Sequence, residues 1–295
     1  MPAARTQLAP DPLWLSAMPG LFVVLWSTGF IGAKFGLPYA EPLTFLALRF
    51  AIVAVLMLGV SVAAGAAWPR SWRDTAHAMV GGLLMQGVYL GGVYFAIAHG
   101  ISAGLSALVV GLQPVLTAAL VGFFLGEVIR PLQWLGVGLG LVGVVLVVAD
   151  KLSFEGGHLA GLASNVAALL GITVGTLYQK RFGHGDLRSI TVLQNAAAAL
   201  ALFLLASRFE TMRIVWSPAL LLAMAWLCIV LSIGATMLLL FLLRRGAASR
   251  TASLFYLVPP VTAFMAFFLF GETLAPGAVA GMAATVAGVA LVNRG

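Results

Sequence analysis

The chain of 295 residues is 62% hydrophobic and only 8% charged, whereas soluble domains carry about a quarter charged residues. This composition indicates an integral membrane protein and leaves no room for a soluble catalytic or nucleic-acid-binding domain. The formal net charge of +7 must then reflect membrane topology, and the single cysteine, Cys228, excludes a disulfide framework and a thiolate metal site.

Ten apolar stretches come close to the roughly 20 residues that a transmembrane helix needs. They cover residues 13–34, 42–64, 76–98, 102–125, 131–149, 158–180, 189–207, 218–241, 250–270 and 276–293. We therefore predict an all-α membrane protein with ten transmembrane helices, whose five-helix halves are residues 13–149 and 158–293. Residues 1–12 are polar and rich in proline, and we assign them to a cytoplasmic tail.

The basic residues of the predicted loops give the orientation. Only five of the 16 Lys and Arg residues fall on the side opposite the N-terminus: Lys34, Arg49, Lys151, Arg208 and Arg213. An excess of Lys and Arg marks the cytoplasmic side of a membrane protein. Both termini are thus predicted to be cytoplasmic, in the inner (cytoplasmic) membrane, and the positive charge does not indicate a nucleic-acid partner.

The first two spans place Trp26, Lys34 and Arg49 within or near the membrane. Arg49 follows Pro42 by seven residues, which is about 10 Å along a helix axis. A charge at the bilayer centre costs about 2.5–3.5 kcal/mol on insertion scales. Lys34 and Arg49 therefore either extend to the membrane surface or face a watery cavity, and the sequence leaves both alternatives open.

Polar side chains recur on one face of the third and fourth spans. Gln86 and Tyr89 share a face of the third, and Gln113 ends a row that begins at Ser102 and Ser106 in the fourth. Such rows either form hydrogen bonds between helices or line a cavity. The depth of Gln86 and Gln113 in the membrane favours the cavity.

The second half carries its own candidates for the same cavity. These are Asn165, Asn195, Ser232, Thr236 and Tyr256. Asn195 occupies the place that matches Arg49 when the halves are aligned, so the two halves need not contribute equally.

Prolines inside the fourth and ninth spans interrupt helical hydrogen bonding, because proline has no N–H and frees the carbonyl four residues before it. Pro114 matches Pro259 in the other half, and Pro260 follows it directly. The prolines are either packing kinks or hinges beside a substrate site.

The strongest signal is an internal repeat, in which residues 114–147 align without a gap with residues 259–292. Each copy reads as an apolar helix, a Gly-Glu turn, a proline and a second apolar helix. The shared residues include Pro114, Gly126, Glu127 and Gly136, matched by Pro259, Gly271, Glu272 and Gly281. We interpret Glu127 and Glu272 as turn residues that either cap the following helix, where a carboxylate is favoured by the helix dipole, or form a charged loop.

This arrangement resembles the drug/metabolite transporter superfamily, in particular the EamA-type permeases, over essentially the whole chain. The resemblance implies two five-helix repeats inserted upside down to each other, a central cavity and alternating access. It also implies a small-molecule substrate, because members of the family export amino acids and other small metabolites. The motifs are signals of fold and do not name a substrate.

Glycine and alanine recur in the fifth and tenth spans at a spacing that allows close helix contact. We interpret these spans as peripheral supports in the lipid bilayer, and a homodimer contact through them remains an alternative. The nine acidic residues all lie in predicted loops or at helix ends, so no carboxylate for proton coupling lies within a span. No motif for an enzyme, a cofactor or a metal occurs.

The sequence thus favours a multi-pass permease that exports small organic metabolites, with amino acids or related compounds first. A drug or sugar-derivative carrier is the alternative within transport. A passive channel or a helical scaffold is less favoured, because no ring of charge marks a filter and a scaffold needs no polar rows in both halves.

The ten-span arrangement predicts opposite locations for two reporter fusions. A reporter after Ser153 should lie outside the cell and one after Gly295 should lie in the cytoplasm. Paired alkaline phosphatase and fluorescent-protein fusions measure this, and the same location for both sites would contradict ten spans.

Overall fold

The structure is a computed structural model that describes residues 13–125, 131, 134–136, 138–139, 142–143, 156–245, 254–272 and 276–294. Within these ranges every regular element of secondary structure is a helix. The only strand-like pairing in the same ranges is an isolated antiparallel bridge between Ala40 and Ile214.

Within the described residues the first half forms three helical segments of membrane-spanning length and a fourth segment whose apolar helix is shorter. They comprise α1 (Leu13–Gly36), α2 (Pro42–Ala63), a third crossing made of α3 (Trp72–Gly82), the π-helix η1 (Leu83–Val88) and α4 (Tyr89–Ala98), and a fourth made of α5 (Ala103–Val110) and α6 (Gln113–Leu125). Most of the predicted fifth span, 131–149, lies outside the described residues.

The second half begins with three long crossings. They are α8 (Gly156–Phe182), α9 (Leu187–Phe209) and a third that joins α10 (Pro218–Ala225), the π-helix η2 (Trp226–Ala235) and α11 (Thr236–Arg245). The 3-10 helix η3 (Phe255–Leu257), α13 (Val258–Phe270) and α14 (Pro276–Arg294) complete the chain.

Six of these crossings are long and apolar enough to span a membrane. They coincide with the first, second, third, sixth, seventh and eighth predicted spans. Shorter apolar helices lie at Ala103–Thr117, Phe255–Phe270 and Val279–Gly288, within the fourth, ninth and tenth. The prediction of an all-helical membrane protein is therefore confirmed, and the division into ten spans and two repeats remains a proposal.

Both predicted proline sites are interrupted helices. In the first half α5 ends at Val110 and α6 starts at Gln113, one residue before Pro114. In the second half the tight η3 precedes α13, which starts one residue before Pro259 and Pro260. The two interruptions touch, because a Cβ atom on Gly111 would lie 2.7 Å from Pro259.

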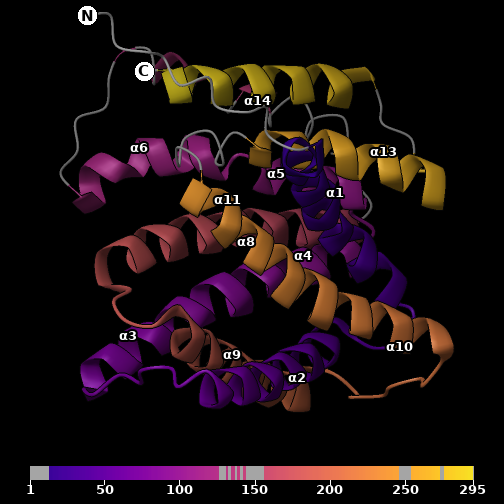
Figure 1. Cartoon of the computed structure of the whole chain (residues 1–295). Coiled ribbons are helices and arrows are strands. Elements are labelled where there is room, and N and C mark those ends of the chain that lie inside the picture. Colours follow the sequence, from indigo (N-terminus) through magenta and orange to yellow (C-terminus); the bar gives the residue numbers. More distant parts are fainter. Residues whose placement is uncertain are drawn as a thin grey trace, which may run out of the picture.

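Helices α2 and α9 pack antiparallel against each other, at the bottom of Figure 1, and their ends are tied together. The Glu210 carboxylate accepts hydrogen bonds from the backbone N–H groups of Leu43 and Thr44 at 2.7 Å, which caps the start of α2. At the other end Arg188 donates to the Ala64 carbonyl at 3.1 Å. An acid at the N-terminus and a base at the C-terminus both match the dipole of α2.

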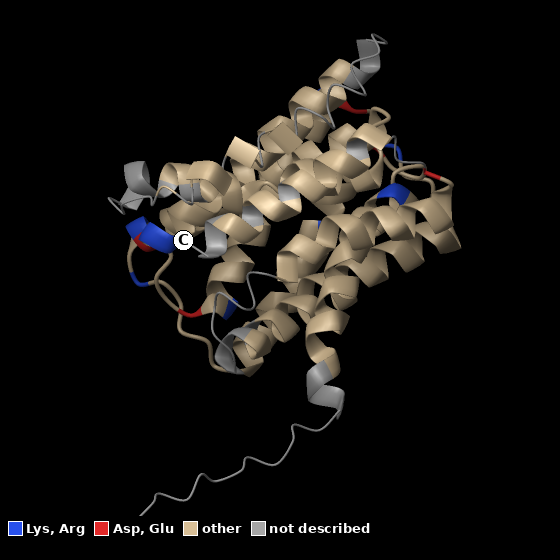
Figure 2. Ribbon diagram, turned by 90° about the horizontal axis from the view of Figure 1, so that it is seen from above, with Lys and Arg blue, Asp and Glu red and all other residues tan. Residues whose placement is uncertain are grey.

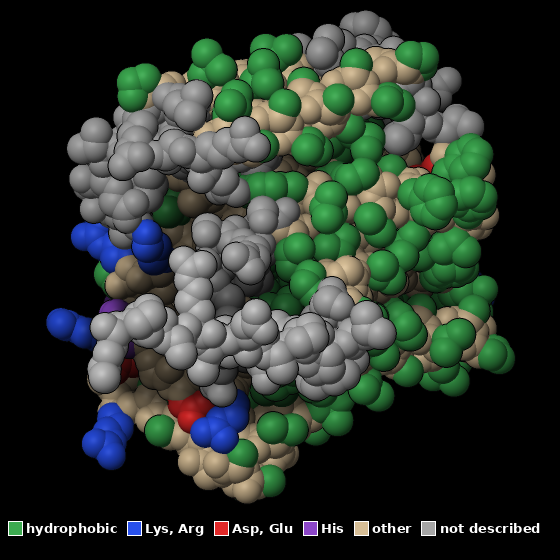
Figure 3. Space-filling view, turned by 45° about the horizontal axis from the view of Figure 1, so that its top comes forward, with side chains coloured by type: hydrophobic (Ala, Val, Ile, Leu, Met, Phe, Trp, Pro, Cys, Tyr) green, Lys and Arg blue, Asp and Glu red, His purple; other side chains and the backbone are tan. Residues whose placement is uncertain are grey.

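Charge and hydrophobicity divide the surface as expected for a membrane protein. Most charged residues lie at two opposite ends of the bundle, with a long uncharged stretch between them (Figure 2). On the face shown in Figure 3 hydrophobic side chains cover the right-hand part, and charged and histidine side chains gather at the left edge. Large exposed side chains such as Leu222 and Phe268 would contact lipid.

The remaining helices stack away from the α2–α9 pair, and α14 lies at the far side, against α6 (Figure 1). The middle layer contains α1, α4, α8 and the crossing of α10, η2 and α11. All of these except α10 line a cavity, and α2 and α9 line the same cavity on the side that we call its floor.

The contact between the third crossing and α9 predicts a strict need for glycine at position 82. A Cβ atom there would overlap the backbone of Gln194, which cannot move aside as a flexible side chain can. Gly82→Ala should therefore lower the melting temperature of the purified protein, by the equivalent of about 1–3 kcal/mol. Gly59→Ala on α2 is the control, because nothing lies within 4 Å of its added Cβ atom. Equal melting temperatures for the two variants would contradict this packing.

Candidate functional site

A cavity of about 400 Å³ lies between the two halves of the chain. Residues from α1, α2, η1, α4, α8, α9, η2 and α11 line it, and most of them are apolar or aromatic. This volume and character are typical of small-molecule sites. A second void, near His77, has only about 10 Å³ and holds no more than one water.

Arg49 is the distinctive side chain of this cavity. Its residue is only 3% exposed, and its guanidinium donates to the Tyr94 hydroxyl at 3.1 Å and to the Ser232 hydroxyl at 3.3 Å. Its buried Nε–H has no hydrogen-bond partner. The N–H donors that have a partner thus bind neutral groups, and among the described residues no carboxylate neutralises the positive charge.

The π-helix η2 helps to place this arrangement. Ser232 donates to the carbonyl of Leu227, five residues earlier, at 2.8 Å, which is the spacing of a π-helix. The hydroxyl of Ser232 thereby keeps its oxygen as an acceptor for Arg49. The Sγ atom of Cys228, also in η2, lies 3.7 Å from the backbone carbonyl oxygen of Arg49. Helix η2 therefore contacts both the backbone and the side chain of this arginine.

Other polar groups of the lining also keep hydrogen-bonding capacity. The buried Oε1 atom of Gln86 in η1 has no hydrogen-bond partner. Asn195 uses its Nδ2 atom to donate to the Thr191 carbonyl at 2.8 Å, which leaves its side-chain oxygen as an acceptor. Arg49 on α2 and Asn195 on α9, which match in the alignment of the two halves, both line the cavity.

The acidic residues that the structure describes are engaged away from this cavity. Each binds a group at a helix end: Glu41 with Thr211, Asp74 with Ser71, Asp186 with Arg188, Glu210 with Thr44, and Glu272 with Lys34. Hydrogen bonds from the side chain of Arg188 hold the pKa of Asp186 well below its usual range, so this carboxylate stays ionised. No carboxylate therefore neutralises Arg49 within the described ranges.

Seven of the residues predicted from the sequence line the cavity: Trp26, Arg49, Gln86, Tyr89, Asn195, Ser232 and Thr236. Four others lie elsewhere. Gln113 donates to Thr176 at 3.1 Å, between α6 and α8, and Asn165 accepts from Ser106 at 2.9 Å, between α8 and α5. These two contacts are hydrogen bonds between helices, and they give Ser106 and Gln113 of the fourth span partners outside the cavity. Tyr256 packs in a buried apolar cluster beside Leu105.

Lys34 is the fourth residue outside the cavity, and its partner is Glu272. The ammonium group forms an ion pair with this carboxylate, which lies 238 positions later in the chain. Glu272 also accepts from the backbone N–H groups of Ala103 and Gly104, at 3.3 and 3.5 Å. It therefore caps α5 from the other half of the chain, and residues 273–275, which lead into α14, lie outside the described residues. Glu127 lies outside the described residues.

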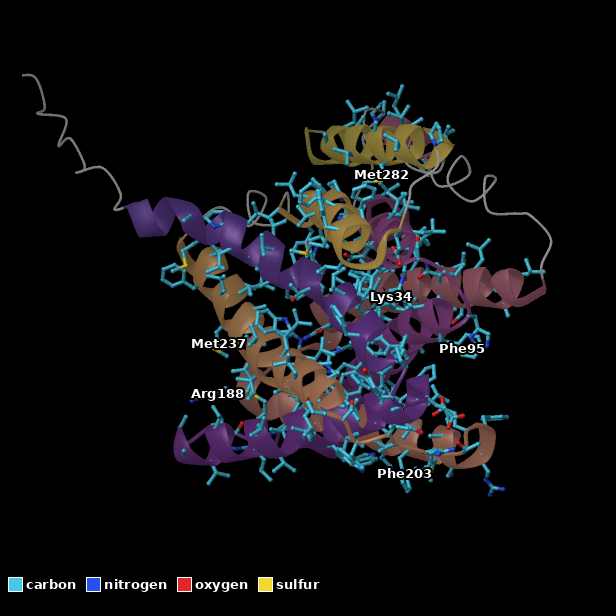
Figure 4. The ribbon with its side chains drawn as sticks, turned by 90° about the vertical axis from the view of Figure 1, so that its right-hand side faces the viewer. Lys34, Phe95, Arg188, Phe203, Met237 and Met282 are labelled. Carbon is cyan, nitrogen blue, oxygen red and sulfur yellow. The ribbon has the colours of Figure 1, made fainter. Side chains whose placement is uncertain are left out.

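The cavity extends toward one end of the bundle only. We call residues 63–72 and 182–189 the Arg188 end, and residues 34–44, 209–215 and 270–272 the Lys34 end. Half-exposed Leu187 and Arg188 line the cavity, whereas no residue of the Lys34 end does. In Figure 4 Arg188 and Met237 lie toward the left, and Lys34 and Phe95 lie toward the right.

The Lys34 end is closed by several contacts between distant segments. Besides the ion pair and the Glu210 cap, Glu41 accepts from the backbone and hydroxyl of Thr211, each at 2.8 Å. The Val215 N–H donates to the Tyr39 carbonyl beside the bridge of Ala40 with Ile214. These contacts join the loop after α1 to the loop after α9.

Several lining residues on α8 and α9 were not predicted from the sequence. They are Gln179, Leu187, Arg188, Thr191 and Gln194. The last four follow the helical spacing of one face of α9, which is the signal that would have identified them. Arg188 was assigned to a loop by its charge alone.

Comparison with known proteins gives the family. Two stretches, residues 17–149 and 158–294, each match the sequence model of the EamA-like transporter family. The chain belongs to the EamA-like transporter family. As an EamA-like protein it has helices with the length and composition of membrane spans, and the cavity lies between the two matched stretches.

Two curated relatives illustrate similarity over about nine tenths of their length. The uncharacterized inner membrane transporter YedA of Escherichia coli strain K12 is 25% identical over 277 residues, covering 92% of this chain and 88% of YedA. A "probable amino-acid metabolite efflux pump" of Salmonella typhimurium is 28% identical over 279 residues, covering 91% of each chain. A solved crystal structure with 20% identity superposes with a TM-score of 0.65 over 95% of this chain and 96% of its own, which supports the fold alone.

The double role of Glu272 predicts unequal effects of removing the two partners. Glu272→Gln weakens both the ion pair and the cap of α5, whereas Lys34→Gln removes only the pair. The melting temperature should fall further for Glu272→Gln, by the equivalent of about 1 kcal/mol, which is typical of a lost charged cap. Arg213→Gln, a change at an exposed arginine, serves as the control. A smaller loss for Glu272→Gln than for Lys34→Gln would contradict the capping role.

Proposed function

We propose that this chain is an inner-membrane permease that exports small carboxylated metabolites, amino acids and related compounds first, by alternating access. The observation that carries this proposal is Arg49, a buried cation without a counter-charge in a cavity that extends to one end of the bundle. An unpaired buried charge is strongly unfavourable, so a site built around one is suited to a ligand that brings the opposite charge. The Salmonella relative's name also supports this class of substrate.

The contacts between helices support two inverted five-helix repeats. Helix α2 packs on α9 and α5 packs on α13, which pairs matching crossings of the two halves. Helix α1 contacts α13 and η2, and its counterpart α8 contacts α6 and η1. Exchanging the halves therefore maps these contacts onto one another, as a two-fold axis in the membrane plane requires.

With the predicted orientation, the Arg188 end is cytoplasmic and the Lys34 end faces outward. The structure then corresponds to an inward-facing state, in which a cytoplasmic substrate reaches Arg49. Export requires the Lys34 end to open, which breaks the Lys34–Glu272 pair and the contacts of Glu41 with Thr211. The cavity must close at the Arg188 end in the same step.

The lining gives no sign of a proton-carrying carboxylate within the described residues. Facilitated or exchange transport is therefore the proposed energetics. A drug or sugar-derivative carrier is the alternative: the aromatic and methionine side chains of the lining suit an apolar drug, but Arg49 disfavours a cationic one.

Metabolite profiling of the growth medium tests this function. Cells that overexpress the wild-type protein should release carboxylated metabolites at higher levels than a deletion strain, and Arg49→Gln should abolish most of the difference. We expect a loss of about 10-fold or more, because a hydrogen-bonded charge pair is worth roughly 1.5–3 kcal/mol. Arg213→Gln, at equal expression, should export like the wild type. Unchanged media for wild-type and deletion cells would contradict the export function.

A further inference from the structure

We propose that the cavity selects amphipathic monocarboxylates without a charged amino group, such as N-acylated or des-amino acids, over free amino acids. This inference rests on the proposed export of carboxylated metabolites, and within that class it favours the compounds related to amino acids over the free amino acids themselves. Its basis is the charge of the cavity rather than the names of relatives.

The first step is the carboxylate site. The guanidinium of Arg49 binds two neutral hydroxyls, and its Nε–H has no partner. A planar guanidinium matches a carboxylate through two parallel hydrogen bonds, and these charge-assisted bonds are stronger than bonds to hydroxyls. A bound carboxylate would both neutralise the buried charge and satisfy its donors.

The second step concerns the ammonium group of a free amino acid. This group sits on the carbon next to the carboxylate, so a carboxylate at Arg49 brings the ammonium close to the guanidinium, where like charges repel. An ammonium also needs an anionic acceptor once it leaves water. The described lining offers none: its charged side chains are Arg49 and Arg188, and Asp186, the partner of Arg188, is not among the lining residues. A ligand with a carboxylate and no ammonium group is attracted to Arg49 and has no positive charge that Arg49 would repel.

The third step is the rest of the lining. Trp26, Phe30, Phe50 and Met57 form apolar walls that suit a hydrocarbon or aromatic body. The unpartnered Oε1 atom of Gln86 is a neutral acceptor, which suits a neutral donor such as an amide N–H or a hydroxyl. Eight residues separate Gln86 from Tyr94 on the same crossing, roughly 12 Å along the axis. Gln86 therefore faces the far part of a molecule whose carboxylate is held beside Tyr94.

Four probes with one aromatic body isolate the charge: phenylalanine, N-acetylphenylalanine, 3-phenylpropanoate and 2-phenylethylamine. In this order, they are a zwitterion, an anion with an amide group, an anion without nitrogen, and a cation. Binding to the purified wild-type protein is measured by the rise in melting temperature and by titration calorimetry. We expect the two anions to bind about 10-fold or more tightly than phenylalanine, and the amine not to bind, because the charge contacts differ by this order.

Variants show whether Arg49 causes the preference. Arg49→Gln should lower the affinity for both anions about 10-fold or more and leave phenylalanine little changed, because the repulsion of its ammonium disappears together with the carboxylate contact. Arg213→Gln, as the matched control, should bind all four probes like the wild type. Gln86→Leu should weaken N-acetylphenylalanine more than 3-phenylpropanoate, since only the former has an N–H donor.

The outcomes separate this inference from the proposed function. Binding of phenylalanine as tight as that of the anions would overturn the inference and leave export of amino acids standing. The inference also fails if Arg49→Gln retains the preference for anions, or if none of the four probes binds to the wild-type protein. Release of carboxylated metabolites into the medium, measured separately, would still decide whether the protein exports them.

Discussion

The pairing of α2 with α9 is the constraint on which the rest of the structure depends. The first N–H groups and the last C=O groups of a helix have no partner within the helix, so other groups must satisfy them. Glu210 does this at the start of α2 and Arg188 at its end, and both belong to the flanks of α9. The pair is thereby fixed along its whole length, and it carries Arg49 and Asn195 on the side that lines the cavity. The other crossings are positioned relative to this floor.

Irregular backbone lies around the cavity in both halves of the chain. The π-helices η1 and η2 occupy the third crossing of each half and supply Gln86 and Ser232 to the lining. The interrupted fourth and ninth spans meet at Gly111 and Pro259. Segments of this kind weaken the regular hydrogen bonding of a helix and are favoured places for bending. Because these segments occupy matching positions, the two halves could bend at equivalent points in the proposed alternating-access cycle.

Composition and periodicity were enough to predict the helical membrane fold and seven lining residues, because lipid imposes strong rules on span length and on polar groups. They could not assign the partners of polar side chains. Gln113 donates to Thr176 and Asn165 accepts from Ser106, so each bonds a hydroxyl of a neighbouring helix instead of lining the cavity. Helical spacing shows on which face of a helix a side chain lies, but it does not show whether that face packs against another helix or lines a cavity. Arg188 was missed for a related reason, since its charge suggested a loop while its spacing matched the lining of α9.

Lys34 and Arg49 also show that the sequence does not identify the partner of a polar side chain, and for these two residues the partner matters for transport. Both are basic residues near the predicted outer side, and only the tertiary structure reveals that Glu272 neutralises one of them. The Lys34 pair is partly exposed, so water screens it and it can break at small cost. Arg49 is buried without an anion, and enclosing it empty costs far more than enclosing it with a carboxylate bound. In the proposed alternating-access cycle, a ligand that neutralises Arg49 stabilises the closed intermediate between the two open states. The loaded carrier should therefore cross more readily than the empty one, a property that favours exchange over net one-way movement.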